Sequence, residues 1–254
     1  MRAPPSTVAA PAAWRTVDLV SDLHLHVEDP ATCEAFTGYL RSTPADAIFL
    51  LGDIFEVWIG DDAALPGSFE ADCAQWLRQA AATRALFFLH GNRDFLVGQA
   101  WLEQAGATLL DDPCLLHWND HRWLLSHGDA LCLADTDYQL FRAEVRQPDW
   151  QAAFLAKPLP ERRAIARGLR QASEARTSSG ADYADADPSL SDAWLSRAGT
   201  DTLIHGHTHR PAEHRTPAGG RRIVLSDWDL RATPPRAEAL RIAADGSMRR
   251  VTLA

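Results

Sequence analysis

Seven side chains of the kinds that bind divalent metal ions lie just after, or at the end of, short apolar runs of the sequence. Asp22 and His24 alternate in SDLHL, so both side chains would face the same way on an extended backbone. The set holds two carboxylates, one amide and four imidazoles: Asp22, His24, Asp53, Asn92, His127, His205 and His207. Such ligands suit Mn²⁺, Fe²⁺, Co²⁺ or Zn²⁺. There are too many of them for one tetrahedral ion, so the set predicts two ions.

A pair of divalent ions indicates hydrolysis of phosphate esters or anhydrides. Two ions held about 3.5–4 Å apart neutralise phosphoryl oxygens, position an in-line attack and lower the pKa of a bridging water. Taken alone, a His or Asp after a strand is more often a cap or a surface residue, and it is the joint pattern that carries the prediction. Two further residues are predicted to have supporting roles: Asp129 orients a loop or a metal-binding histidine, and His209 supports the HGHTH loop.

Six short apolar runs predict the strands that position these side chains. The polar tails that follow five of them read SDLH, GD, HGN, SHGD and HGHTH. In open α/β sheets the active crevice lies outside the carboxyl ends of the strands, so the tails are predicted to converge on one site. Helical stretches around 31–41, 70–82 and 99–105 alternate with the runs, which is an α/β pattern. The runs are TVDLV (16–20), AIFLL (47–51), ALFFL (85–89), RWLLS (122–126), TLIH (202–205) and RIVLS (222–226).

Between about 133 and 196 the pattern changes from strands to helices, which predicts a helical insertion. Pro160 suits the first turn of a helix. From 142 to 176, eight Lys and Arg residues accompany four Asp and Glu residues, a local charge of +4 in an otherwise acidic chain. Aromatic and aliphatic residues are interleaved with these charges. The segment TSSGADYADADPS that follows is small and polar, and it predicts a loop.

Composition limits the class of protein. The 254 residues, 46% of them hydrophobic, suffice for one α/β core with an insertion. A formal charge of −9 argues against a general nucleic-acid binder, because that binding needs a basic surface. The four cysteines show no CxxC spacing, which favours a reducing, cytosolic setting. Residues 1–15 lack a basic start and an apolar stretch of signal-peptide length and are expected to form a disordered tail. No run of apolar residues is long enough to cross a membrane.

The tails DxH, GD, GN, HGD and GHTH, in this order, resemble those of the calcineurin-like metallophosphoesterase superfamily. Longer segments narrow the resemblance: LLGDIFEVWIGDD, FLHGNRDFLVG, HGDALCLADTDYQLFRAEVR and LIHGHTHRPA are similar to the UDP-2,3-diacylglucosamine hydrolase family of lipid A assembly in Gram-negative bacteria. The match spans most of residues 17–230. It implies a four-layer α/β sandwich over 16–254, with two mixed sheets flanked by helices and a helical cap over an acyl-chain pocket.

The resemblance also implies the reaction and its residues. The diphosphate bond of UDP-2,3-diacylglucosamine would be hydrolysed to UMP and 2,3-diacylglucosamine 1-phosphate (lipid X) at a site with two Mn²⁺ ions. The seven side chains above would be the metal ligands, with Asp53 as the bridge. The catalytic residues would be Asp53, Asn92, Arg93 and His205, and the substrate contacts would come from Asn92, Arg93, Asp135, Ser173 and His205.

The sequence departs from the family within the predicted insertion. Thr177 and Gly180 align with a substrate-binding asparagine and lysine of the family, so the lysine contact is missing at this point. Arg176 is the nearby basic residue that could replace it.

Arg93, in GNRD, indicates which type of phosphate bond is cleaved. Many phosphoesterases of this superfamily carry a histidine after GN, which can protonate an alkoxide leaving group. An arginine cannot deliver a proton near neutral pH, but its guanidinium can hold phosphate oxygens. A phosphate monoester, with a second pKa of about 6, leaves without a strong acid. GNRD therefore favours cleavage of an anhydride over cleavage of a simple alkyl ester.

The basic and apolar insertion suits a lipid-linked sugar nucleotide and an anionic membrane surface, so we expect a cytoplasmic protein bound peripherally to the inner membrane. A solvated helical face is the alternative for this segment. The alternatives for the whole chain are a soluble metallophosphoesterase acting on nucleotides, and a protein-binding scaffold that has lost catalysis. The complete ligand set argues against the scaffold, and the apolar insertion argues against small soluble substrates. Nothing in the sequence indicates an obligate protein partner.

Overall fold

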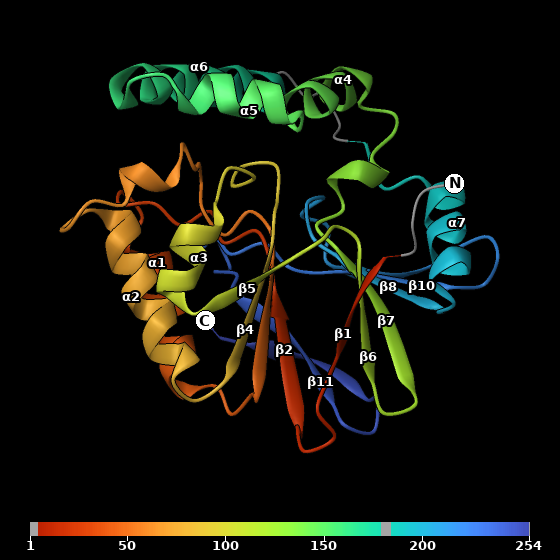
Figure 1. The fold of residues 1–254 in the computed structure, drawn as a ribbon. Coiled ribbons are helices and arrows are strands. Elements are labelled where there is room, and N and C mark those ends of the chain that lie inside the picture. Colours follow the sequence, from red (N-terminus) through yellow and green to blue (C-terminus); the bar gives the residue numbers. More distant parts are fainter. Residues whose placement is uncertain (1–4, 179–183, 254) are drawn as a thin grey trace.

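Two β-sheets pack face to face at the centre of the molecule (Figure 1). The computed structural model describes residues 5–178 and 184–253, with the backbone alone for 172–178. Within these residues each sheet has six strands, in the orders β12-β11-β2-β3-β4-β5 and β1-β6-β7-β8-β10-β9. Both sheets mix parallel and antiparallel pairs. Helices cover their outer faces, so the predicted four-layer α/β sandwich is confirmed.

The six predicted apolar runs all form strands. The first sheet contains β2 (Thr16–Val20), β3 (Ala47–Leu51), β4 (Ala85–Leu89), β5 (Ala107–Leu110), β11 (Glu238–Ala243) and β12 (Met248–Thr252). The second contains β1 (Ser6–Ala9), β6 (Cys114–Trp118), β7 (His121–Ser126), β8 (Thr202–His205), β9 (Ala212–Arg215) and β10 (Arg221–Val224). Strands β2, β3 and β8 are almost continuously buried because layers lie on both of their faces.

The space between the sheets is filled by side chains that alternate with those facing the outer helices. Leu19 and Phe49 of the first sheet belong to the same fully buried cluster as Leu125 and Ile204 of the second. Removing these apolar surfaces from water stabilises the sandwich and holds the strand ends in a fixed arrangement. The loops at those ends are therefore carried by a rigid scaffold.

Four helices pack on the outer faces of the sheets. α1 (Pro30–Ser42), α2 (Phe69–Ala81) and α3 (Gln99–Ala105) cover the first sheet, and α7 (Pro188–Ala198) covers the second. Side chains accept hydrogen bonds from first-turn amides in three of them: Asp29 caps α1, Ser68 caps α2 and Asp187 caps α7. The predicted helical stretches at 31–41, 70–82 and 99–105 correspond to α1, α2 and α3.

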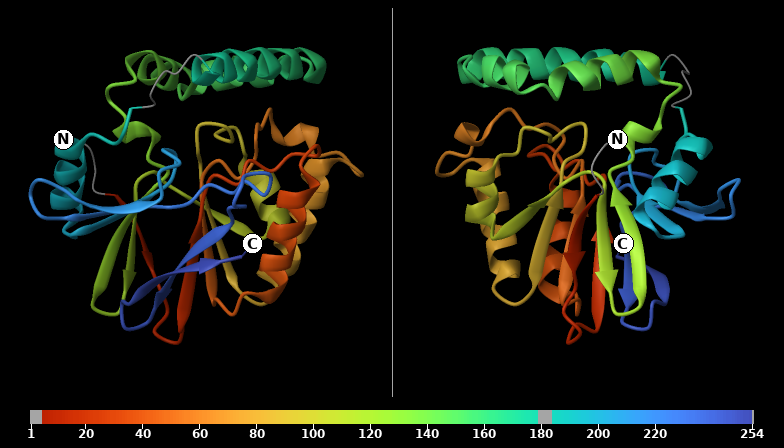
Figure 2. Two further views of the ribbon diagram at one scale, coloured as in Figure 1. Left: turned by 180° about the vertical axis from the view of Figure 1, so that it is seen from behind. Right: turned by 45° about the vertical axis from the view of Figure 1, so that its right-hand side comes forward.

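Three further helices form a separate layer, which we call the cap: α4 (Thr136–Val145), α5 (Pro148–Leu155) and α6 (Leu159–Ser178). Figures 1 and 2 show them side by side above the two sheets. Short 3₁₀ turns lie at Asp61–Ala63 and Asp129–Leu131. The predicted insertion at about 133–196 thus includes the cap and also α7, which packs on the sheet through Leu195.

The N-terminal segment differs from the expected disordered tail. Residues 6–9 form β1, which pairs in parallel with β6 in the register Ser6 to Cys114. The strand is short and half-exposed, because it lies at the edge of its sheet. A Pro- and Ala-rich sequence does not predict such a strand, because an edge strand needs few apolar residues. Residues 1–4 lie outside the described part.

We searched the described helices for one able to span a bilayer. None combines the length and the apolar character that a transmembrane helix needs.

Candidate active site

The predicted metal ligands lie at the carboxyl ends of β2, β3, β4, β7 and β8, and all of them except His205 lie in the loops that follow these strands. Several of them have a backbone in the left-handed region, with φ of 55° at Asp22, 50° at His24, 52° at Asp53 and 67° at His207. Such a conformation costs about 1–3 kcal/mol for a residue with a side chain and persists only where the surroundings enforce it. Backbone hydrogen bonds do so here, from Asp22 N to Gly52 O (3.1 Å) and from His24 N to Asp53 O (3.0 Å).

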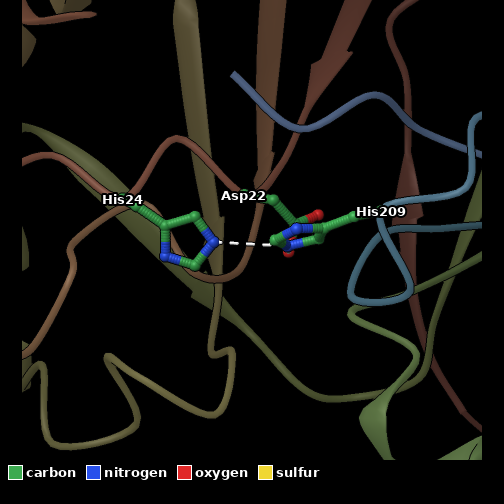
Figure 3. Close-up of side chains that lie close together, drawn as sticks. All are labelled: Asp22, His24 and His209. Atoms are coloured by element: carbon green, nitrogen blue, oxygen red, sulfur yellow. Dashed lines mark hydrogen bonds and ion pairs between the residues drawn. The ribbon is translucent and has the colours of Figure 1, made fainter. Parts of the chain in front are cut away.

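Two groups of ligand atoms meet at the centre of the site. Asp22, Asp53 and His127 form one group and are all buried, and Asp22, His24 and His209 form the other. Within each group the ligand atoms lie within 4.8 Å of one another. Figure 3 shows the second group, in which His24 and His209 turn their Nε2 atoms toward each other at 3.3 Å. Asp22 is common to both groups, so the arrangement offers two adjacent positions for cations.

Asn92 joins the groups to the HGHTH loop. Its Oδ1 lies 2.9 Å from Nε2 of His127 and 2.9 Å from Nδ1 of His207. The backbone amide of His207 also donates to the carboxylate of Asp22, at 2.9 Å to Oδ2. The structure therefore brings together six of the seven predicted ligands: Asp22, His24, Asp53, Asn92, His127 and His207.

His205 is directed away from this cluster. It is fully buried, its Nδ1 lies 2.8 Å from the carbonyl of Gly206, and its Nε2 lies 3.3 Å from Nη1 of Arg222. His209, which was expected to support the loop, lies instead beside Asp22, with 3.4 Å between Nε2 and Oδ1. The physical reason is the end of β8, since His205 still belongs to the strand and the turn begins only after it. We therefore propose His209 in place of His205 as a ligand.

Glycines allow the loops to approach so closely. A Cβ atom at Gly91 would lie 2.1 Å from Oδ1 of Asp53, and one at Gly206 would lie 2.2 Å from Oδ2 of Asp22. Neither carboxylate could stay in place if these positions carried a side chain. The glycine of HGN and the glycine between the histidines of HGHTH thus make room for the two central carboxylates.

The donor set fits a pair of divalent ions. Asp22 is fully buried and Asp53 is 2% exposed, so their charges need cations close by. In this structure a proton on the neighbouring His127 supplies the positive charge. Burial lowers the pKa of His127, but the charges of Asp53, Asp22 and Asp129 outweigh burial and raise it to about 9.

The contacts of the His127 ring also indicate that the site needs positive charge. Both of its nitrogens face oxygens, Nδ1 the carbonyl of Leu51 at 3.0 Å and Nε2 the amide oxygen of Asn92 at 2.9 Å. Nε2 is also 3.6 Å from Oδ1 of Asp53. A proton on Nε2 of His127 therefore lies close to oxygens that can themselves bind a metal ion. This is expected where a proton and a metal ion compete for one position.

His207 and Asp22 differ in their electrostatics. Burial, followed by the charge of His127, lowers the pKa of His207 to about 4, which keeps its imidazole neutral. Burial raises the pKa of Asp22, but hydrogen bonding and the charge of His209 overcome that effect and hold it well below the usual range. A neutral imidazole and an ionised carboxylate are the forms that bind metal ions.

The predicted substrate contacts are only partly described. Arg93 lies at the site: its amide donates to Oδ1 of Asp53 (2.8 Å) and its guanidinium contacts Glu56 (3.0 Å). Asp135 caps α4 by accepting from the amide of Tyr138 at 3.3 Å. Ser173 and Thr177 lie in α6, where only the backbone is described, and Gly180 and its neighbours lie outside the described residues.

Asp129 connects the site to the cap. Its buried carboxylate accepts hydrogen bonds from Oη of Tyr138 (2.5 Å) and Nε of Arg142 (2.7 Å), both on α4. Arg146, the residue that caps the C-terminal end of α4, donates to the carbonyl of Gly91 (2.8 Å). The carboxylate predicted to orient a loop or a histidine thus holds α4 against the SHGD loop, and Arg146 holds it against the HGN loop.

Sequence reasoning missed two acidic residues near the ligands. Asp94, fully buried, accepts hydrogen bonds from the amides of Gly91 (2.7 Å) and Ile54 (2.8 Å), so it joins the HGN loop to the loop after β3. Glu56 lies beside His24 and Arg93. The signal for both was their place in the sequence, since Asp94 follows Asn92 by two residues and Glu56 follows Asp53 by three.

Comparison with known proteins identifies the family. The model of the calcineurin-like phosphoesterases matches residues 15–211. A UDP-2,3-diacylglucosamine hydrolase of Chromohalobacter salexigens is 45% identical over 92% of this chain and 96% of its own. The chain belongs to the UDP-2,3-diacylglucosamine hydrolase family of calcineurin-like phosphoesterases.

Other members of this hydrolase family are similarly close. Proteins of the same name from Bordetella pertussis and Stenotrophomonas maltophilia are 47% and 44% identical to this chain. The matches cover 90% and 88% of this chain, and 92% and 95% of those proteins. The similarity therefore includes the cap as well as the sheets and the site loops.

Proposed function

We propose that the protein hydrolyses the diphosphate bond of UDP-2,3-diacylglucosamine, giving UMP and 2,3-diacylglucosamine 1-phosphate in lipid A biosynthesis. The observation that carries this proposal is identity of 44–47% to hydrolases named for this substrate, over about nine tenths of the chain. The convergence of metal-binding side chains beneath a helical cap supports it.

The proposed ligands are Asp22, His24, Asp53, Asn92, His127, His207 and His209. We propose that these residues would hold two Mn²⁺ ions. The family resemblance implies a shared role for Asp53, and the two groups of ligand atoms indicate a shared role for Asp22. When bound, the ions would neutralise the diphosphate oxygens and lower the pKa of the attacking water.

Arg93 is the residue that suits a diphosphate substrate. Its side chain is about one quarter exposed and lies next to Asp53. A guanidinium there can hold phosphate oxygens in two parallel hydrogen bonds. Because the leaving group is a phosphate monoester with a second pKa of about 6, this site needs no proton donor after GN. We propose further contacts to the substrate from Asp135, Ser173, Thr177 and the segment around Gly180.

We also propose that the cap rests on the cytoplasmic face of the inner membrane. Leu140, Leu155 and Leu169 of the cap are exposed to 73%, 40% and 46%. Arg163 and Arg167 are exposed on the same layer. Exposed leucines with nearby cations suit an anionic lipid surface. Flotation with anionic liposomes at low and high salt tests this contact, and absence of binding at both salt concentrations would contradict it.

The activity is tested by incubating the protein and Mn²⁺ with several phosphate compounds. We expect UMP from UDP-2,3-diacylglucosamine, no release once a chelator is added, and little turnover of UDP-sugars without acyl chains. Rapid turnover of p-nitrophenyl phosphate without UMP release from the lipid would instead support a soluble phosphoesterase. No turnover of any compound would support a scaffold.

A further inference from the structure

Glu56 makes contacts that join the metal site, the proposed phosphate-binding arginine and the cap. It follows Asp53 by three residues, in GDIFE, and its side chain is 12% exposed. Its Oε2 lies 3.2 Å from Nδ1 of His24. Its Oε1 lies 3.0 Å from Nη1 of Arg93 and 3.3 Å from Nε of Arg170 on α6. One carboxylate thus meets side chains from three separate segments.

The orientation of His24 gives Glu56 a role at the site. Nε2 of His24 points toward His209 and the metal-binding atoms (Figure 3), so Nδ1 is the nitrogen that faces Glu56. Nδ1 is buried and has no well-directed hydrogen bond among the described residues. Glu56 is therefore the carboxylate placed to accept its proton once the ring turns slightly. A proton held on Nδ1 leaves the lone pair on Nε2, where an ion would bind.

We propose that Glu56 is a positioning residue for His24: it fixes the ring and its tautomer through Nδ1, while its other oxygen holds Arg93 and Arg170. The inference rests on the proposed metal site, because His24 must be a ligand for the role to matter. It goes beyond that proposal by assigning a function to a residue outside the ligand set.

The charges around Glu56 support the same role. The guanidinium groups of Arg93 and Arg170 both face the carboxylate of Glu56, which holds the two cations on one side of the site. Without Glu56 the guanidinium of Arg93 would lose this carboxylate and would repel the metal ions more strongly. The contact with Arg170 also joins α6 to the metal site.

The simplest alternative is that Glu56 only tethers the cap. Asp62 offers a matched control, because it forms a two-oxygen pair with Arg162 of α6 and Nη1 of Arg162 is 2.8 Å from its Oδ1. Within the described part of the chain, the side chain of Asp62 makes no hydrogen bond or ion pair with a candidate ligand. Glu56→Gln and Asp62→Asn therefore make the same change of charge, and each removes one link between core and cap, but only the first touches His24.

Calorimetric titration of the metal-free full-length protein with Mn²⁺ separates these roles, with the thermal midpoint measured for each variant. Loss of an outer carboxylate behind a metal-binding histidine weakens metal affinity by about 10–100-fold. We expect Glu56→Gln to show a loss in this range, Glu56→Asp a smaller one, and Asp62→Asn a change of less than about twofold. If Glu56→Gln does not fold, Glu56→Asp carries the test, because it keeps the charge and withdraws it by one methylene.

Two results would overturn the inference. One is a wild-type affinity in the Glu56 variants, and the other is an equal loss in Glu56→Gln and Asp62→Asn. Both would leave the proposed function intact, provided that the wild type binds Mn²⁺. Absence of Mn²⁺ binding by the wild type would instead remove the metal site, and the inference with it.

Discussion

At the scale of single residues, the position of each ligand relative to its strand decides its role. Asp22, Asp53, Asn92, His127 and His207 all come one to three residues after the end of a strand. His205 is the last residue of β8 itself, and its ring packs toward Arg222. The sequence shows three alternating histidines in HGHTH, and alternation alone does not reveal where the strand stops. This is why the register of the last two ligands could not be predicted.

The two outer histidines of HGHTH give a prediction that tests this register. Replacing His209 by Ala should remove an atom that faces Asp22 and His24, and so weaken binding of Mn²⁺ at that group by at least tenfold. Replacing His205 by Ala should leave Mn²⁺ binding close to wild type and lower the stability by about 1–3 kcal/mol, because Arg222 and the Gly206 carbonyl lose a partner. Metal titration and urea unfolding of both variants distinguish the two residues. The reverse pattern would restore His205 as the ligand.

Arg93→His tests the choice of an anhydride over an ester. An imidazole is shorter than a guanidinium and cannot make its two parallel hydrogen bonds, so a charged contact of about 1.5–3 kcal/mol is lost. We expect kcat/KM for UMP release to fall by about tenfold or more. Arg249→His, an exposed change on β12, is the control. Unchanged turnover in Arg93→His would contradict the role of the arginine.

At the scale of elements, the strands that the sequence predicted are those near the centre of the sheets. Strands β1, β5, β9 and β12 were missed, and all four lie at sheet edges with most of their residues at least partly exposed. Strand β6 was missed as well, although it lies inside its sheet and is mostly buried. Edge strands need few apolar residues and often carry charges. Strand β11 was missed for another reason: it contains the buried Arg241, whose Nε donates to Asp18 at 2.7 Å. A buried ion pair on two strands cannot be inferred from one of them.

The link between the cap and the 3₁₀ turn at Asp61–Ala63 gives a prediction on pH. The hydrogen bond and the charge of Arg162 lower the pKa of Asp62 below its ordinary value of 3.8. A carboxyl whose pKa is lower in the folded state contributes stability above its unfolded pKa and loses that stability as the pH falls through the folded pKa. Asp62→Asn should therefore be less stable than wild type at pH 7.

The difference in stability should shrink below about pH 4, where Asp62 becomes protonated in the unfolded wild type. Urea midpoints of both proteins between pH 7 and pH 3 measure it. A difference that stays constant over this range would show that the pair with Arg162 contributes no pH-dependent stability.

At the scale of the whole molecule, several basic residues of the cap bind the core of the protein, whereas the sequence suggested only a role in binding the substrate and the membrane. The segment from 142 to 176 carries eight basic residues, but Arg142, Arg162 and Arg170 pair with core carboxylates. Arg146 donates to a carbonyl of the HGN loop. Part of the excess positive charge thus fastens the cap to the core. Sequence spacing could not show this, because Arg162 and Arg170 lie a hundred residues or more from their partners Asp62 and Glu56.

The central claim is that seven side chains from five loops hold two metal ions. A crystal of the protein grown with Mn²⁺ and measured for anomalous scattering tests it directly. The account predicts two anomalous peaks about 3.5–4 Å apart, among the side chains of Asp22, Asp53, Asn92, His207 and their neighbours. A single peak, or two peaks elsewhere in the molecule, would contradict it.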